Sequence, residues 1–379
     1  MTAMGSSATG WPGLADTERR VLLELLLHGS LSRIRLAERV GLSRASLTRI
    51  ARELVDLGLV LEGEVEIKAT RGRPAESLHL RPEAAHFAGV KLTGDHVYAV
   101  LTDLSARVVA EQVTPIVDRD VHVVVDSIGR LVAQLSEQVA TPVAVGIGVA
   151  GDVTRASGRA ILERSNFLGW DGVPLEDLVT AATGLPSTVS NDVHALAAAH
   201  HWFGETRQHR SMVVYGLGAG IGSGIVIDGE LIEGAHGRSG RIGHTRVGGA
   251  GRPCDNGHTD CVHSFVTMPA IEANAGSGYA EALRAAAAGD ERAADAFGWA
   301  AYALGATIAE IVNTLDPELV VIMGEGRDMI DLASSELRRG LAEYLEQGSA
   351  DSVRVVTPPF DFGLYARGAA VAAMRSLLA

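Results

Sequence analysis

Cysteine, aromatic residues and long hydrophobic runs are all scarce in this chain of 379 residues. Its two cysteines are too few for the disulfide framework of a secreted domain, so we expect a reducing, cytoplasmic location. No stretch approaches the roughly 18–20 consecutive apolar residues of a membrane span. The opening MTAMGSSATGWPG lacks the basic and apolar regions of a signal peptide. We therefore expect residues 1–15 to form a disordered tail and no part of the chain to enter a membrane.

Acidic residues outnumber basic ones, and the chain carries a formal net charge of −13. The imbalance is uneven, because residues 16–82 contain 12 basic and 10 acidic residues and the remainder contains 21 basic and 36 acidic. An acidic body repels nucleic-acid phosphates, but a mildly basic module at one end does not. The charge pattern therefore leaves nucleic-acid binding open for residues 16–82.

Apolar residues recur at helical spacing in the first part of this basic module. Thr17, Ser32 and Ser43 are expected as N-caps, and a glycine turn at Gly41 separates the second helix from the third. The predicted helices cover residues 17–29, 32–40 and 43–58. Their small core is expected to contain Leu36, Ala37, Val40, Leu47, Ile50 and Leu54. This order of elements is typical of a helix-turn-helix.

Polar residues line the front of the third predicted helix, where a recognition helix meets base edges in the major groove. Two strand-like runs follow, and the arginines at the tip between them suit a wing that contacts phosphates or the minor groove. The alternative is a three-helix protein-interaction module with a solvated basic face. We predict a winged helix-turn-helix DNA-binding domain over residues 16–82. The candidate DNA-binding residues are Ser43, Arg44, Ser46, Thr48, Arg49, Arg71 and Arg73.

Strand-like and helical runs alternate over residues 83–379, which predicts an α/β fold. Strands in threes interleaved with helices occur twice, so we expect two lobes with a ligand cleft between them. Lobe 1 is predicted over about 83–190 plus the C-terminal helix, and lobe 2 over about 191–360. The glycine-rich stretch GLGAGIGSG suits either a phosphate contact or a relaxed hairpin. The predicted strands lie within 86–116, 142–151, 187–192, 212–234, 318–326 and 352–359, and the predicted helices within 120–139 and 194–204.

Several motifs in order resemble those of the ROK family (repressor, open reading frame, kinase). They are RGRPA, GIGVAG, NFLGW, SND, GAGIGSGIVIDG, GRSGRIGH and CDNGHTDC. The resemblance runs from about residue 16 to the end and implies a two-lobed, actin-like α/β domain behind the winged helix. The family contains sugar kinases and sugar-responsive transcription factors, and in general the latter carry the DNA-binding module.

The phosphate-loop position of the resemblance argues against a kinase. The family's catalytic aspartate corresponds to Asp192, but its phosphate loop, Asp-x-Gly-x-Thr, corresponds to a segment with Lys91 and Thr93 in place of the aspartate and the first glycine. Phosphoryl transfer depends on positioning and charge stabilisation around metal and phosphates, and a lysine at this position cannot help to hold a metal ion. We therefore predict no catalytic residue and no enzymatic activity. The expected function is a repressor of double-stranded operator DNA that forms a homodimer or a higher homo-oligomer. The alternatives are a sugar kinase with an appended DNA-binding module and a ligand-independent regulator.

The sugar-binding positions implied by the resemblance are altered as well. Arg241 and His263 stand where the family has glutamates, so two hydrogen-bond acceptors are replaced by a cation and an imidazole. Arginine pairs well with carboxylate or phosphate, so an anionic or acidic sugar is the expected effector.

The alternative is a pocket that Arg241 fills and that binds nothing. The candidate ligand-binding residues are Ser157, Gly158, Asn166, Asn191, Asp192, Arg241, His244 and His263.

The stretch CDNGHTDC resembles the structural zinc site of ROK repressors. The family's ligands correspond to His244, Cys254, Asn256 and Cys261, with an asparagine in place of the middle cysteine. The expected metal residues are therefore His244, Cys254 and Cys261, with the second nitrogen of His244 directed toward the effector. A fourth ligand would come from Asp255, His258, Asp260 or water. Zinc binding is expected to be weak and to be strengthened by Asn256→Cys. Free thiols and a redox-sensing disulfide are the competing interpretations.

Overall fold

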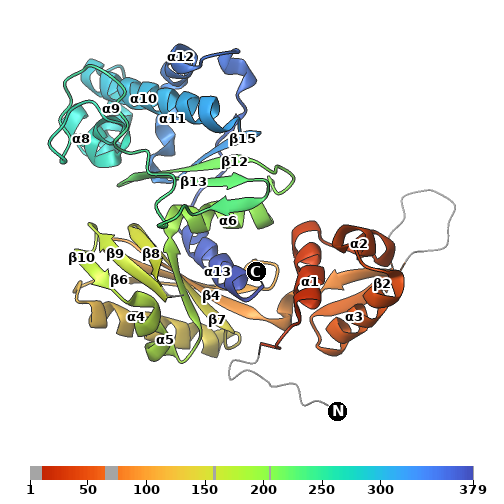
Figure 1. Ribbon diagram of the computed structural model, residues 1–379. Coiled ribbons are helices and arrows are strands. Elements are labelled where there is room, and N and C mark those ends of the chain that lie inside the picture. Colours follow the sequence, from red (N-terminus) through yellow and green to blue (C-terminus); the bar gives the residue numbers. More distant parts are fainter. Residues whose placement is uncertain (1–10, 65–75, 157–158, 205, 379) are drawn as a thin grey trace. The chain divides into compact units, whose positions relative to one another are not determined.

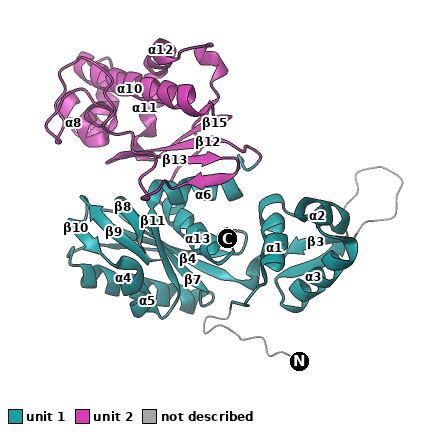
Figure 2. Ribbon diagram, viewed as in Figure 1, with its two compact units in different colours: residues 1–207, 363–379 teal, residues 208–362 magenta. Residues whose placement is uncertain are grey.

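The computed structural model describes residues 11–64, 76–156, 159–204 and 206–378. The chain divides into two compact units, Met1–Arg207 with Gly363–Ala379, and Gln208–Phe362 (Figure 2). The division falls 17 residues after the predicted lobe boundary, because the helix that follows residue 191 packs within the first unit. Among the described helices, none has the combination of length and hydrophobicity needed to cross a bilayer.

A winged helix-turn-helix occupies the first part of unit 1, as predicted (Figure 1). Its three helices are followed by a hairpin, and a short strand between the first two helices pairs with the hairpin to give the strand order β1-β3-β2. All six apolar residues predicted for its core are buried. The elements are α1 (Asp16–His28), β1 (Leu31–Ser32), α2 (Arg33–Val40), α3 (Arg44–Asp56), β2 (Val60–Glu64) and β3 (Glu76–Leu80).

Side-chain caps fix two of these three helices. The hydroxyl of Ser43 accepts a hydrogen bond from the backbone N–H of Ser46 (3.1 Å), and Ser32 caps α2 in the same way. The prediction of Thr17 as the first cap is wrong, because Ala15 is the N-cap and its N–H donates to the Glu18 carboxylate (2.7 Å). A glutamate at the third helical position satisfies this N–H without a polar cap side chain.

Residues 11–15, the described part of the predicted disordered tail, pack against the domain, and residues 1–10 lie outside the described residues. Trp11 and Leu14 are buried, and the Trp11 ring lies edge-on to Phe87 with 6.0 Å between the ring centroids. These residues belong to one apolar cluster with the helix-turn-helix core and with Met374 of the C-terminal helix. The winged helix and the α/β part of unit 1 are therefore packed together.

The α/β part of unit 1 is built on a five-stranded sheet of order β11-β7-β4-β5-β6. The strands β4, β5 and β6 form the predicted antiparallel meander, and β7 and β11 extend it in parallel. Helix α13 packs closely on the sheet, since a Cβ on Gly89 would collide with the Ala366 carbonyl and one on Gly146 with that of Ala369. The elements are η1 (Pro82–Ala84), β4 (His86–Leu92), β5 (His96–Asp103), β6 (Val108–Pro115), α4 (Val121–Gln138), β7 (Ala144–Val149), α5 (Leu175–Thr183), β11 (Ser187–Asn191), α6 (Asp192–Phe203) and α13 (Gly363–Leu378).

A second sheet in the α/β part of unit 1 was not predicted from the sequence. It is three-stranded and antiparallel in the order β10-β9-β8. The Asn-to-Trp segment NFLGW forms the turn from β9 into β10, and the Trp170 indole donates to the Arg119 carbonyl (2.7 Å). The strands are β8 (Asp152–Ala156), β9 (Arg159–Ser165) and β10 (Trp170–Val173).

Unit 2 repeats the α/β plan with a sheet of order β14-β13-β12-β15-β16. Its core lies between this sheet and the long helix α10, against which α8, α9 and α12 pack. The predicted last strand is only two residues long. The elements are β12 (Met212–Leu217), β13 (Ile221–Ile227), β14 (Glu230–Ile232), α7 (His263–Val266), α8 (Met268–Ala275), α9 (Tyr279–Ala287), α10 (Glu291–Leu315), β15 (Leu319–Met323), η2 (Glu325–Arg327), α11 (Asp328–Leu332), α12 (Ser334–Tyr344), η3 (Ala350–Ser352) and β16 (Val355–Val356).

Candidate functional site

The front of helix α3 presents polar side chains to solvent. Arg44, Thr48 and Arg49 are exposed, and Leu47 and Ile50 anchor the opposite face in the core. The hydroxyls of Ser43 and Ser46 contact each other at the start of the helix (2.9 Å). A rigid helix that buries one face and exposes a polar N-terminal turn has the geometry with which a recognition helix enters a major groove.

The arginines of this face differ in their partners. Arg49 forms an ion pair with Glu53 one turn along α3 (2.6 Å), whereas Arg44 has no ion pair within the described residues. A further arginine, Arg52, is exposed on the same helix and was missed, although its spacing of three from Arg49 signals a shared face. The wing arginines Arg71 and Arg73 lie outside the described residues.

The aspartate predicted at the kinase-like centre of unit 1 is held in a buried ion pair. Asp192 is the first residue of α6, and its Oδ2 accepts a hydrogen bond from the Lys91 ammonium on β4. The side chains of Lys91 and Asp192 are only 5% and 9% exposed. The other carboxylate oxygen accepts the Val193 N–H (2.9 Å), and the Tyr365 ring lies 4.8 Å from the ammonium. Asp192 is therefore neutralised from within the chain.

The other ligand candidates of unit 1 differ in burial and in hydrogen bonding. Asn191 caps α6, because its side-chain oxygen accepts the N–H groups of Val193 (3.0 Å) and His194 (3.3 Å) and its amide donates to the Gly151 carbonyl (3.0 Å). Asn166 is exposed in the turn before β10. Ser157 and Gly158 lie outside the described residues. The structure thus gives Asn191 a structural role that the sequence did not indicate.

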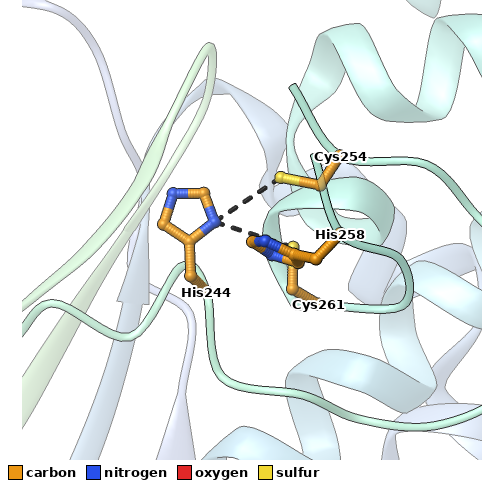
Figure 3. A group of neighbouring side chains, drawn as sticks. All are labelled: His244, Cys254, His258 and Cys261. Atoms are coloured by element: carbon orange, nitrogen blue, oxygen red, sulfur yellow. Dashed lines mark hydrogen bonds between the residues drawn. The ribbon is translucent and has the colours of Figure 1, made fainter. Parts of the chain in front are cut away.

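Four nitrogen and sulfur donors converge in unit 2 (Figure 3). The Nδ1 atom of His244 lies 3.6 Å from the Cys254 sulfur and 3.7 Å from the Cys261 sulfur, and His258 joins them with every donor atom within 4.8 Å of the others. A tetrahedral zinc ion with ordinary bond lengths places its nitrogen and sulfur ligands about 3.6 Å apart. The spacing of these donors fits a zinc ion.

Hydrogen bonds of the loop backbone hold these donors in place. The Cys254 N–H donates to the His258 carbonyl (2.8 Å), and Gly257 between them has a φ of +79°, which glycine adopts without strain. Asp260, one of the predicted fourth ligands, accepts the Arg252 N–H (2.7 Å) instead. The metal-competent group, which consists of His244, Cys254, His258 and Cys261, includes neither Asp255 nor Asp260. Of the three acidic and imidazole candidates, only His258 is placed to act as the fourth ligand.

The histidines of this region also contact one another. His244 stacks on His263, with 5.4 Å between the ring centroids, and its Nε2 lies 2.9 Å from the Asn256 amide nitrogen. The second nitrogen of His244, expected to face the effector, is thus engaged by Asn256. Burial lowers the pKa of His244, and the neighbouring His263 and His258 lower it further. Arg241, the remaining ligand candidate, is exposed.

Comparison with protein families assigns the fold. The ROK family profile matches residues 87–375, and a winged helix-turn-helix DNA-binding profile matches residues 14–60. The chain belongs to the ROK family. This confirms the resemblance found in the motifs, and the two-lobed kinase-like fold that it implied is the fold observed.

Similar ROK proteins include regulators and kinases. The DNA-binding transcriptional dual regulator NagC of Escherichia coli K12 is 28% identical over 318 residues, covering 79% of this chain and 77% of NagC. The xylose repressor of Caldicellulosiruptor bescii is 25% identical and covers 84% of this chain and 85% of the repressor. A ROK family transcriptional regulator, described as a homologue of the E. coli MLC protein, matches with a TM-score of 0.82, 25% identity and 96% of both chains. A ROK glucokinase from Streptomyces griseus, solved with glucose and AMPPNP, matches with a TM-score of 0.66, 26% identity and 77% of this chain against all of the kinase.

Proposed function

We propose that this ROK protein is a transcriptional regulator that binds operator DNA through its winged helix and answers to a sugar-like effector. The observation that carries the proposal is the combination of a winged helix-turn-helix with a kinase-like fold whose central aspartate is already paired with Lys91. Similarity to curated sugar regulators over most of the chain supports it. A regulator of this kind acts on chromosomal DNA, which agrees with the expected cytoplasmic location.

The same ion pair argues that the chain does not transfer phosphoryl groups. A general base must be within hydrogen-bonding reach of the hydroxyl it deprotonates and must have a free lone pair for the proton. Asp192 is buried, its Oδ2 faces an ammonium and its Oδ1 accepts a backbone N–H. In the kinase alternative, a substrate hydroxyl would therefore have to compete with Lys91 for this buried carboxylate.

The effector is proposed to be an anionic sugar or sugar derivative that acts by shifting a conformational equilibrium. Arg241 and His263 supply positive or neutral donors where the family has glutamates.

Helix α6 of unit 1 begins at Asp192 and ends at Phe203. Near its end, Leu23 and Leu27 of α1 pack on the apolar cluster that includes Trp202. Helix α6 thus links a ligand candidate to the DNA-binding module. The effector changes operator binding only through different affinities for the two states.

A structural zinc ion is proposed for the cluster of His244, Cys254, His258 and Cys261. The buried Nε2 of His258 has no hydrogen-bond partner within the described residues, and a bound cation would satisfy it. Burial raises the pKa of the Cys254 thiol, and the adjacent Cys261 raises it further; a bound cation would favour the thiolate instead. Zinc would cross-link His244 to the last part of the loop that connects β14 to α7.

A DNA-binding titration across salt concentrations tests the regulator proposal, and a coupled kinase assay with a panel of hexoses and amino sugars tests the alternative. We expect binding of a pseudo-palindromic operator by a homodimer, weakening steeply with salt because phosphate contacts release counterions. We expect no ATP-dependent turnover. Sugar phosphorylation that disappears in Asp192→Asn would replace the regulator proposal with the kinase.

A further inference from the structure

Asn256 occupies the position at which the family motif has its middle cysteine. Its side chain, however, contacts the ring nitrogen of His244 that lies on the side away from the two cysteines. The two thiols lie 3.6 and 3.7 Å from Nδ1 of His244, whereas the Asn256 amide lies 2.9 Å from Nε2 of the same ring. The second ring nitrogen of His244 points away from the sulfur atoms (Figure 3). Asn256 therefore lies behind the histidine, outside the group of converging donors.

His258 reaches into that group from two residues further along the loop. Its ring lies edge-on to His244, with 5.3 Å between the centroids and 86° between the planes. The left-handed turn at Gly257 carries residue 258 back toward Cys254, whose N–H bonds the His258 carbonyl (2.8 Å). In this loop, residue 258 therefore lies within the group of converging donors and residue 256 lies outside it.

We infer that Asn256 is a positioning residue for His244 and that His258 replaces the missing cysteine, which changes the site from three sulfur ligands to two sulfur and two nitrogen ligands. This inference rests on the proposed zinc site. When Nδ1 of a neutral imidazole binds a cation, the ring proton resides on Nε2 and needs an acceptor. An asparagine amide supplies either a donor or an acceptor according to its orientation, so it bonds His244 with and without the metal.

The consequence reverses the expectation drawn from the spacing of the cysteines. Asn256→Cys does not strengthen zinc binding, because the new thiol faces the outer side of His244. Asn256→Ala weakens zinc binding about 10- to 100-fold, the usual effect of losing the hydrogen bond behind a histidine ligand. Asn256→Asp, whose carboxylate accepts the Nε2 proton, retains the affinity. His258→Ala loses more affinity than Asn256→Ala, because it removes a ligand.

Zinc affinity by competition with a chromophoric chelator and absorption of the cobalt-substituted full-length chain test these statements together. The sulfur-to-cobalt charge-transfer band grows with each thiolate, so the unmodified chain and Asn256→Cys should show the same two-thiolate intensity. Asp255→Asn is the matched control, since this neighbour lies outside the metal-competent group and should leave affinity unchanged. A three-thiolate band with tighter binding in Asn256→Cys, or unchanged affinity in both Asn256→Ala and His258→Ala, would overturn the inference. Absence of zinc and cobalt binding in every variant would instead refute the proposed zinc site, and the inference with it.

Discussion

The Lys91–Asp192 pair of unit 1 and the His/Cys cluster of unit 2 place ionisable side chains together in opposite ways. In unit 1 the chain supplies both the anion and the cation, and the two side chains are 5% and 9% exposed. In unit 2 the chain supplies four donors and no cation, and the His258 Nε2 is buried without a partner in the described part of the chain. The first arrangement is complete by itself, and the zinc ion that we propose would complete the second.

The difference shows how a fold shared with kinases serves a regulator. Lys91 stands where the family's phosphate loop has an aspartate, and it neutralises the side chain that a kinase uses as its base. Asn256 stands where the family has a cysteine, and the neighbouring His258 takes over the role of donor. In our proposal, one substitution closes a site from within, and the other is compensated by His258 so that a site for an ion is retained.

Removing the internal cation of unit 1 should have the largest effect on stability. Lys91→Met leaves Asp192 buried without its partner, and we expect the free energy of unfolding to fall by about 3–5 kcal/mol. Lys91→Met combined with Asp192→Asn should recover most of this loss, because no buried charge then remains. Urea unfolding of the single and double variants measures both values. A loss below about 1 kcal/mol in Lys91→Met would place the pair among exposed ion pairs and contradict its burial.

Removing the external cation of unit 2 should have the next largest effect. Chelation of zinc, or Cys254→Ser, should lower the free energy of unfolding by about 2.7 kcal/mol relative to a chain with free zinc at 100 times its dissociation constant. Thermal unfolding with and without chelator measures the loss. The shift should be the same in Lys91→Met, since the two sites belong to different compact units and independent sites contribute additively. A chain whose unfolding is insensitive to both zinc and chelator would show that unit 2 needs no ion.

Two exposed arginines of helix α3 differ in a similar way: Arg49 pairs with Glu53 of the same helix, whereas Arg44 has no ion pair within the described residues. Arg44→Ala should cost about 1–3 kcal/mol of discrimination between operator and random DNA, because no described ion pair holds this side chain back from the bases. Arg49→Ala should cost less, since Arg49 must first leave Glu53. Competition binding against random duplex measures both variants. Equal losses for the two arginines would mean that the Arg49–Glu53 pair has no influence on DNA binding.

Glu53→Gln should have the smallest effect. The variant frees Arg49 at a cost of about 0.3–0.5 kcal/mol in helix stability, the usual value of an exposed pair one turn apart. Affinity for both operator and random DNA should rise slightly, and the dependence of binding on salt should steepen. Arg339 pairs with Glu336 on helix α12 in unit 2, so Glu336→Gln is a matched control that should leave DNA binding unchanged. Weaker DNA binding in Glu53→Gln would show that Glu53 orients Arg49 rather than restrains it.

Local signals in the sequence were sufficient for much of the fold. Ser32, Ser43 and the predicted helix-turn-helix core were identified because caps and apolar spacing act within one or two helical turns. Thr17 failed as a cap because the helix begins before it, at Asp16, and the Glu18 carboxylate accepts the N–H of the N-cap residue Ala15. The sheet of β8, β9 and β10 was missed because its strands have mixed exposure and weak alternation.

The candidate sites needed more than local signals. The motif placed Asp192 and the two cysteines, but the contact of Lys91 with Asp192 joins residues 101 positions apart. Likewise, the choice of His258 over Asp255 and Asp260 depends on the turn at Gly257 and on the hydrogen bond that engages Asp260. Spacing along the chain gave the candidates, and only the three-dimensional path of the loop distinguishes them.

Selection of genomic fragments by the intact protein tests most directly the claim that this kinase-like fold serves gene regulation. The source genome is fragmented, incubated with the purified chain at moderate salt, and the bound fragments are sequenced. We predict enrichment of fragments that contain two similar half-sites about one helical turn apart, and loss of this enrichment with Arg44→Ala. Binding of all fragments alike, with no preference over random DNA, would contradict the claim.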